Sequence, residues 1–183
     1  MGSVNTKIKF TYKDYKSLPE SETNRYELIE GELIMVPSPN IYHQRISRKL
    51  EFLLEDFVRK NKLGEVFYAP LDVHLGENVI QPDILFIFRE HSYAITREEI
   101  KGAPDLVIEI LSPSTTERDK TCKRTLYARY GAREYWIVDP AEETIEVLTF
   151  KKEGYETFSV YKKIDTLTSP LLPELRIKLT EIF

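Results

Sequence analysis

Two carboxylates stand in or beside stretches that are otherwise apolar. Glu109 interrupts the apolar run from Leu106 to Leu111, and Asp83 comes immediately before a second run, Ile84 to Phe88. Neither run alternates with polar residues, which is typical of strands covered on both faces. Burying an unpaired carboxylate costs roughly several kcal/mol, so we expect Glu109 to have a proton, a cation or a metal ion beside it.

Neighbouring strands can bring these two acids to one end of a sheet. Adjacent strands lie only about 4.8 Å apart, and Asp83 sits at the mouth of the preceding apolar run. Asp105 shares a strand face with Glu109 but stands about 13 Å away, too far to bind the same ion. Two carboxylates that open at one sheet end can hold a hard cation such as Mg²⁺. A basic side chain nearby could then orient an attacking water or stabilise transition-state charge.

The residues after the second acid predict a turn, a helix and a return to the sheet. The segment SPSTTE cannot continue a strand, because its proline removes a backbone donor. Ser114 and Glu117 have capping-box spacing, which predicts a helix starting near Thr115. Gly131 is suited to end that helix, and Tyr135 to Val138 then predicts another strand.

This predicted helix has two distinct faces. Cys122, Leu126 and Tyr130 recur every four residues and predict a buried apolar stripe. Asp119 and Lys123 also lie four apart, on a neighbouring face. If exposed, that pair would form a helix-surface salt bridge worth about 0.3–0.5 kcal/mol.

The remaining patterns predict an α/β sandwich around a mixed sheet, with added β structure at both ends. At the N-terminal end they predict a loosely attached polar arm over residues 1–25 with a short helix near Tyr12 to Leu18, and then a hairpin over Tyr26 to Val36 turning at Glu30-Gly31. The middle of the chain is expected to contain a long helix from Asn40 to about Asn61, a strand over Glu65 to Leu75, a turn over Asn78 to Gln81 and a short helix near Arg97 to Lys101. At the C-terminal end they predict a hairpin over Thr144 to Phe150 and Tyr155 to Tyr161, and a tail docking through Leu171, Leu172, Leu175 and Ile177. Residues 26–183 are expected to form a single domain.

Composition excludes several classes of protein. The 183 residues are 42% hydrophobic and 31% charged, as in an ordinary soluble globular domain. The net charge of −4 argues against broad nonspecific nucleic-acid binding. Cys122 is the only cysteine, so an internal disulfide is impossible. No stretch approaches the roughly 18–20 apolar residues of a membrane span, and the expected location is the cytoplasm.

Several of these motifs together resemble a known family. Gln81-Pro82-Asp83 followed by Glu109 is similar to the Pro-Asp…(Asp/Glu)-X-Lys pattern of the PD-(D/E)XK nuclease superfamily. The longer string PDLVIEILSPST…GAREYWIVDP resembles the bacterial Uma-two family of restriction endonucleases. YELIEGEL, His43 and the C-terminal PELRIKLTEIF fit the same family. The two-acid motif is weak evidence by itself, whereas the long string is specific and the resemblance covers nearly the whole chain.

The resemblance implies a restriction-endonuclease-like αβββαβ core and Mg²⁺- or Mn²⁺-dependent hydrolysis of DNA. Asp83, Glu109 and the Ile110 backbone carbonyl would hold the ion. Leu111 departs from the superfamily pattern, because it occupies the position of the usual lysine. A lysine from the next helix would replace it, with Lys123 the first candidate and Lys120 the second.

Further residues are candidates for accessory roles. Glu27 could supply a third acid, and His43 and Gln44 begin the long helix, whose N-terminus suits a phosphate. Asp119 is a possible metal ligand, although a first-turn charge favoured by the helix dipole is the commoner role. The expected DNA contacts come from Arg118, Lys120 and Arg124, and the expected partners are DNA and a second copy of the chain.

Two other functions are consistent with the same residues. A decayed nuclease scaffold could bind nucleic acid or protein without cleaving, as Leu111 and the net charge of −4 would allow. An assembly protein could use the terminal β additions to dimerise. Metal-stimulated cleavage separates the nuclease from both alternatives.

Overall fold

A mixed six-stranded sheet is the centre of the protein. In the computed structural model, which describes residues 8–19 and 25–183, its strand order is β11-β10-β9-β8-β6-β3. The strands are β3 (Gly64–Tyr68), β6 (Ile84–Phe88), β8 (Leu106–Ile110), β9 (Glu134–Asp139), β10 (Thr144–Lys151) and β11 (Gly154–Lys162). Only β8 and β9 are parallel; every other neighbouring pair in this sheet is antiparallel. The C-terminal hairpin β10–β11 therefore widens the sheet, as predicted.

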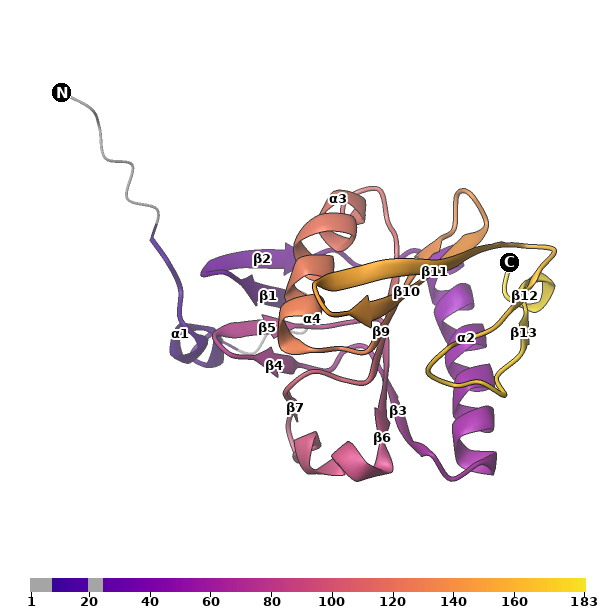
Figure 1. Ribbon diagram of the computed structural model, residues 1–183. Helices are drawn as coiled ribbons and strands as arrows, with labels where there is room; N and C mark the ends of the chain where they lie inside the picture. Colours follow the sequence, from indigo (N-terminus) through magenta and orange to yellow (C-terminus); the bar gives the residue numbers. More distant parts are fainter. Residues whose placement is uncertain (1–7, 20–24) are drawn as a thin grey trace.

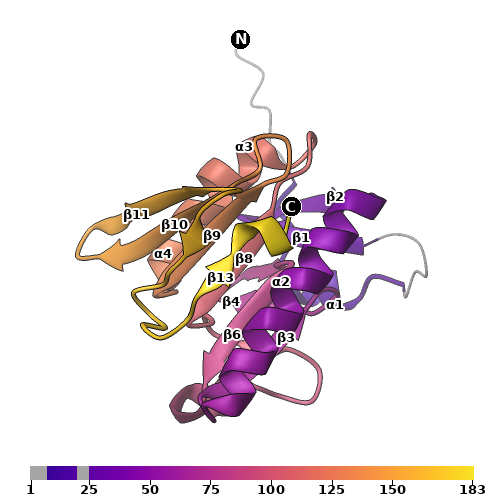
Figure 2. The same ribbon diagram turned by 90° about the vertical axis from the view of Figure 1, so that its right-hand side faces the viewer.

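Helices cover both faces of this sheet (Figures 1 and 2). Helix α2 (Ile41–Lys60) lies on one face with the C-terminal segment, which contains β12 (Thr166–Leu167), β13 (Ile177–Lys178) and a 3-10 helix (Leu179–Glu181). The other face carries α3 (Thr116–Arg118), a π-helical turn (Asp119–Lys123) and α4 (Arg124–Tyr130). The order α2, β3, β6, β8, α3–α4, β9 confirms the αβββαβ core. Among the described helices, none is long and apolar enough to cross a membrane.

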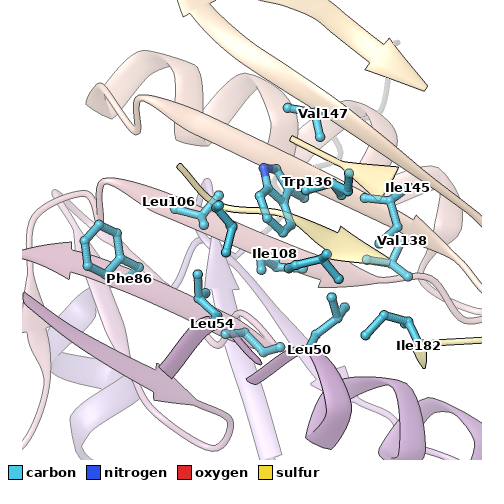
Figure 3. Packing of buried hydrophobic residues seen from close by; sticks show 14 of the residues in the cluster. Leu50, Leu54, Phe86, Leu106, Ile108, Trp136, Val138, Ile145, Val147 and Ile182 are labelled. Carbon is cyan, nitrogen blue, oxygen red and sulfur yellow. The ribbon is translucent and has the colours of Figure 1, made fainter. Parts of the chain in front are cut away.

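Helix α2 has the N-cap and the buried apolar stripe that the sequence predicts. Asn40 is its N-cap and accepts a hydrogen bond from the His43 backbone N–H at 2.8 Å. Its apolar stripe is buried against Phe86, Ile108 and the indole of Trp136, as predicted (Figure 3). The tail residues Leu172, Leu175 and Ile177 close the same core, and Leu171 packs on it less deeply.

A second sheet lies beside the first and has the order β2-β1-β5-β4-β7. Its strands are β1 (Arg25–Ile29), β2 (Glu32–Val36), β4 (Val73–Leu75), β5 (Asn78–Ile80) and β7 (Ile100–Lys101). The β1–β2 turn falls at Glu30-Gly31, as predicted, with φ of 52° and 85°. This hairpin carries the buried side chain of Glu27.

Three predictions in this region were wrong. The continuous strand over 65–75 is two strands in different sheets, separated by the cis peptide before Pro70. The predicted turn at 78–81 is strand β5, because the Asn78 side chain bridges the Glu30 N–H and the Leu75 carbonyl inside the sheet. Residues 97–101 contain β7 instead of a helix; the 3-10 helix in this connection is Arg89–Ala94.

The described part of the N-terminal arm is attached more firmly than predicted; residues 1–7 and 20–24 of that arm lie outside the described residues. Helix α1 (Tyr12–Lys16) forms where expected. The Tyr12 ring stacks on His74 with centroids 3.9 Å apart, and its hydroxyl donates to Glu99. The Tyr15 hydroxyl donates to Asp72 at 3.0 Å. Two aromatic side chains therefore fix α1 to the small sheet, which the polar composition of the arm did not indicate.

The helix after β8 buries a different face from the one predicted. Thr115, not Ser114, is the N-cap, and no side chain caps the helix there. Tyr130 is exposed and Cys122 half-buried, whereas Asp119, Lys123 and Tyr127 are buried together with Leu126. In the π-helical turn the backbone N–H groups bond to carbonyls five residues back instead of four. The turn therefore contains one more residue, which rotates the side chains of α4 about the helix axis. Apolar periodicity could not find this face, because two of its four buried residues, Asp119 and Lys123, are charged.

Candidate active site

The two predicted acids meet at one end of the central sheet. Ile84 of β6 is the direct partner of Ile108 of β8, so Asp83 lies opposite Glu109 in the extension of this ladder. Asp83 Oδ2 accepts a hydrogen bond from the Ile110 N–H at 2.8 Å, which holds the carboxylate against the end of β8. The predicted convergence of the two carboxylates therefore agrees with the geometry.

Glu109 has the cationic neighbour that its burial requires. Its side chain is 4% exposed, and Lys123 Nζ donates to Glu109 Oε1 at 3.0 Å. The Tyr127 hydroxyl donates to the same oxygen at 2.6 Å. The predicted cation is thus a lysine from the helix on this face of the sheet, and the tyrosine is an additional partner that sequence reasoning missed.

Lys123 lies inside a cluster of carboxylates. Its Nζ is 2.9 Å from Glu27 Oε1, 3.0 Å from Glu109 Oε1 and 3.5 Å from Asp119 Oδ1. Leu111, in the position of the usual lysine, is buried in the apolar core beneath this helix. The ammonium group therefore reaches Glu109 from the next helix, whereas Lys120 points elsewhere and pairs with Asp139 at 3.7 Å.

Burial and charge shift the protonation of this cluster. Burial, opposed by Lys123 and supported by neighbouring acids, raises the pKa of Glu109 well above its usual value. Burial also raises the pKa of Asp119, against the opposing charge of Lys123. Desolvation alone would lower the pKa of Lys123, but the charges of Glu109, Glu27 and Asp119 outweigh it and raise that pKa. The lysine is therefore charged at neutral pH, and the acids in excess favour a proton or another cation.

His43 contacts both Asp83 and the end of β8. Its Nε2 is 3.2 Å from Asp83 Oδ2 and 3.0 Å from the Ile110 carbonyl oxygen. Burial lowers the pKa of His43, but the hydrogen bond and charge of Asp83 outweigh burial and raise that pKa. The neighbouring Gln44, in the first turn of α2, lines the cavity onto which these groups open.

A cavity of about 650 Å³ opens onto these groups. Its walls come from β1, the β2–α2 connection, the first half of α2, the end of β3 and the segment after β8. Asp83, Glu109, Lys123, Glu27 and Asp119 all line it, so the structure collects most of the candidates at one place. This size is typical of a ligand-binding cleft.

Only one of the three predicted DNA-binding cations lines this cavity. Arg118 lines it and lies 3.9 Å from Glu27. Lys120 and Arg124 line a separate surface hollow, where Arg124 donates to the Tyr155 carbonyl at 3.1 Å. Arg118 is therefore the only one of the three placed to meet a phosphate beside the acids.

The donor atoms suit a hard divalent cation. Within the described part of the chain, Asp83 Oδ1 and Glu109 Oε2 have no hydrogen bond, and the Ile110 carbonyl uses one of its two lone pairs on His43. Buried Asp119 Oδ1 has no hydrogen-bond partner either. Over residues 8–19 and 25–183, no three His, Cys, Asp or Glu side chains form a ready cage, so an ion would use two carboxylates and a carbonyl.

Glu27 is the clearest candidate for a residue that positions Lys123. Glu27→Gln keeps an acceptor for the Gln81 N–H, which lies 2.9 Å from Glu27 Oε1, but removes a full charge from beside Lys123. If the site cleaves DNA as the family resemblance implies, the cleavage rate is expected to fall about 10- to 100-fold, because a misplaced catalytic group loses orientation. Cleavage rate and thermal unfolding should both be measured. Glu142→Gln on the exposed β9–β10 turn is the control; equal rates for the two variants would contradict this role.

Two of the groups gathered here gave little signal in the sequence. Glu27 alternates in a hairpin and resembles an exposed strand residue, yet it is 1% exposed because β1 pairs with β5 beside the site. Tyr127 falls one position off the predicted apolar stripe. Its four-residue spacing from Lys123 was the only indication that both would face Glu109.

Comparison with known proteins finds a matching family, a curated relative and similar solved structures. A family model named Uma2 and described as "Putative restriction endonuclease" matches residues 12–180. The "Uncharacterized protein sll1609" of Synechocystis sp. is 27% identical over 137 residues, covering 73% of this chain and 76% of that protein. A crystal structure from Anabaena variabilis, titled "putative nuclease belonging to DUF820", matches with a TM-score of 0.80 and 26% identity. The match covers 95% of this chain and 97% of the Anabaena chain.

Proposed function

Because the chain belongs to the Uma2 family of restriction endonucleases and has a nuclease-like fold, we propose that it is a metal-dependent endonuclease hydrolysing phosphodiester bonds of DNA. The observation that carries this proposal is the pairing of Lys123 Nζ with Glu109 Oε1 at 3.0 Å, opposite Asp83. Two acids and an ammonium group at the base of one cavity are the parts that phosphodiester hydrolysis needs.

The residues have separate roles in this proposal. Asp83, Glu109 and the Ile110 carbonyl would hold Mg²⁺ or Mn²⁺. When bound, the ion would supply Lewis-acid polarisation of the phosphoryl oxygens and lower the pKa of a bound water. Lys123 would position the attacking water and stabilise negative charge on the phosphate, since its ammonium group stays charged. Glu27 and Asp119 would hold that ammonium group in place.

Other polar groups would orient the substrate. Arg118 lines the cavity and can donate to a phosphate oxygen, and Gln44 offers an amide from the first turn of α2. Asp83 keeps His43 in contact with the Ile110 carbonyl. His43 would therefore hold the Ile110 carbonyl in place beside Asp83.

A decayed scaffold is the less supported reading. It was suggested by Leu111, which cannot provide the usual amine. Lys123 would take that role from the neighbouring helix, and its hydrogen bond to Glu109 at 3.0 Å supports the active enzyme over the decayed scaffold. A homodimer and a cytoplasmic location remain predictions; light scattering would measure the first and cell fractionation the second.

Glu109→Ala should reduce cleavage by at least about 10²- to 10³-fold, the usual cost of losing a group that stabilises the transition state. The assay follows supercoiled plasmid and single-stranded DNA with Mg²⁺, with Mn²⁺ and with chelator; chelator should abolish cleavage by the unsubstituted protein.

Two further variants keep this test interpretable. Glu109→Gln preserves side-chain shape if Glu109→Ala does not fold, and Glu156→Ala, exposed on β11, is the matched control. Cleavage that continues unchanged in chelator, or in both Glu109 variants, would remove the assignment.

A further inference from the structure

An exposed aromatic side chain stands at the wall of the active-site cavity. Tyr68, the last residue of β3, lines the cavity and is 62% exposed. It pairs with Ile84 in the sheet, and the next residue, Ala69, donates its N–H to the Asp83 carbonyl at 3.0 Å. The ring is therefore attached through a rigid backbone to the strand that carries a proposed catalytic acid.

The reacting groups lie deep relative to this ring. The side chains of Glu109 and Lys123 are 4% and 5% exposed, whereas Asp83 is 20% exposed. A phosphodiester must consequently enter the cavity to reach them. The phosphodiesters of a duplex lie on its outside, but its bases are paired and stacked on both faces, so only an unpaired nucleotide can bring a base face against a ring on the cavity wall.

The lining suits an unpaired nucleotide chemically. Arg25, Arg48 and Arg118 line the same cavity and offer cations to the phosphates of a bound strand. Pro37 and Pro70 line it as well and restrict the backbone on either side.

We propose that the cavity takes unpaired DNA, with Tyr68 as the stacking platform for a base and the arginines along its phosphates. The inference rests on the proposed nuclease function and specifies the substrate class of that site. Tyr68 is a specificity-determining residue in this assignment and takes no part in the chemistry. Single strands, and duplexes with a gap or bubble, are bound in preference to continuous duplex.

Binding of a labelled short oligothymidylate, measured by fluorescence anisotropy in chelator at fixed salt, tests the proposal without requiring cleavage. Tyr68→Ala is expected to weaken single-strand binding about 5- to 150-fold, the range measured for one base–aromatic stack. Tyr68→Phe and Tyr68→Trp should bind like the unsubstituted protein, and Tyr68→Leu should bind like Tyr68→Ala. Binding of continuous duplex should change by less than about twofold, because duplex bases offer no free face.

Tyr93→Ala is the matched control, since Tyr93 is 82% exposed on the 3-10 helix and does not line the cavity. Equal single-strand affinity of Tyr68→Ala and Tyr93→Ala would overturn the proposal, as would tighter binding of duplex or of the matching RNA than of single-stranded DNA. A gapped duplex that binds like the single strand supports it.

The outcomes separate this inference from the proposed function. Tyr68-dependent binding without metal-stimulated cleavage would support the substrate class and reject the nuclease. Metal-dependent cleavage of duplex and single strand that is indifferent to Tyr68→Ala would reject the substrate class and leave the nuclease intact.

Discussion

Lys123→Met is expected to lower DNA cleavage about 10²- to 10³-fold, the largest effect on catalysis that we anticipate outside the metal-binding acids. Methionine preserves most of the length and apolar body of the side chain but removes the charge that lies 3.0 Å from Glu109. The attacking water and the developing phosphate charge would then lose their only proposed ammonium partner.

The same substitution should make stability depend on pH. Burial raises the pKa of Glu109 above its unfolded value while Lys123 opposes that shift, so Lys123→Met raises it further. A group with a raised folded pKa stabilises the protein below its unfolded pKa, and this stability is lost as pH rises through the folded value. The variant should therefore lose more free energy of unfolding in alkaline than in acidic buffer.

Cleavage of plasmid under single-turnover conditions, together with urea unfolding at several pH values, measures both effects. Lys120→Met is the matched control, since Lys120 is 45% exposed and pairs only loosely with Asp139; we expect its rate within about threefold of normal. Lys123→Arg retains the charge and should keep the protein folded. Full activity in Lys123→Met would exclude the proposed amine.

Glu134→Ala should destabilise the fold by at least about 3 kcal/mol, because it leaves three donors, two of them on buried side chains, without an acceptor. Glu134 is fully buried and accepts from Trp136 Nε1 at 2.6 Å, Ser169 Oγ at 2.6 Å and the Leu171 N–H at 3.0 Å. These bonds fasten the C-terminal segment to β9.

Urea denaturation measures this loss, and Glu153→Ala in the exposed β10–β11 turn is its control. Glu134 pairs with Leu106, at the opposite end of β8 from Glu109, so cleavage per folded molecule should be unchanged. Glu134→Gln keeps one acceptor oxygen and should lose less. A change below about 1 kcal/mol in Glu134→Ala would show that the carboxylate does not hold the tail.

Much of the site was predictable because its backbone is locally encoded. Two dense apolar runs predict neighbouring buried strands. Asp83 and Glu109 stand beside or within these runs, where a charged side chain needs a compensating partner. Asn40 caps α2 through its own side chain, which sets the start of that helix at Ile41 and places His43 in its first turn. Hairpin and cap signals act over a few residues, so the sequence by itself determined these elements. The meeting of the two acids could be expected only because successive strands usually lie beside one another in a sheet.

Tertiary structure alone decided which partners surround those acids. Glu27 reaches Lys123 only because β1 pairs with β5 in a separate sheet, and strand pairing between distant segments leaves no local pattern. Lys123 and Tyr127 turn inward because Glu109 satisfies them, so a buried charge replaces the apolar stripe that periodicity predicts. Burial patterns report that a residue is covered, whereas the identity of its partner depends on long-range packing.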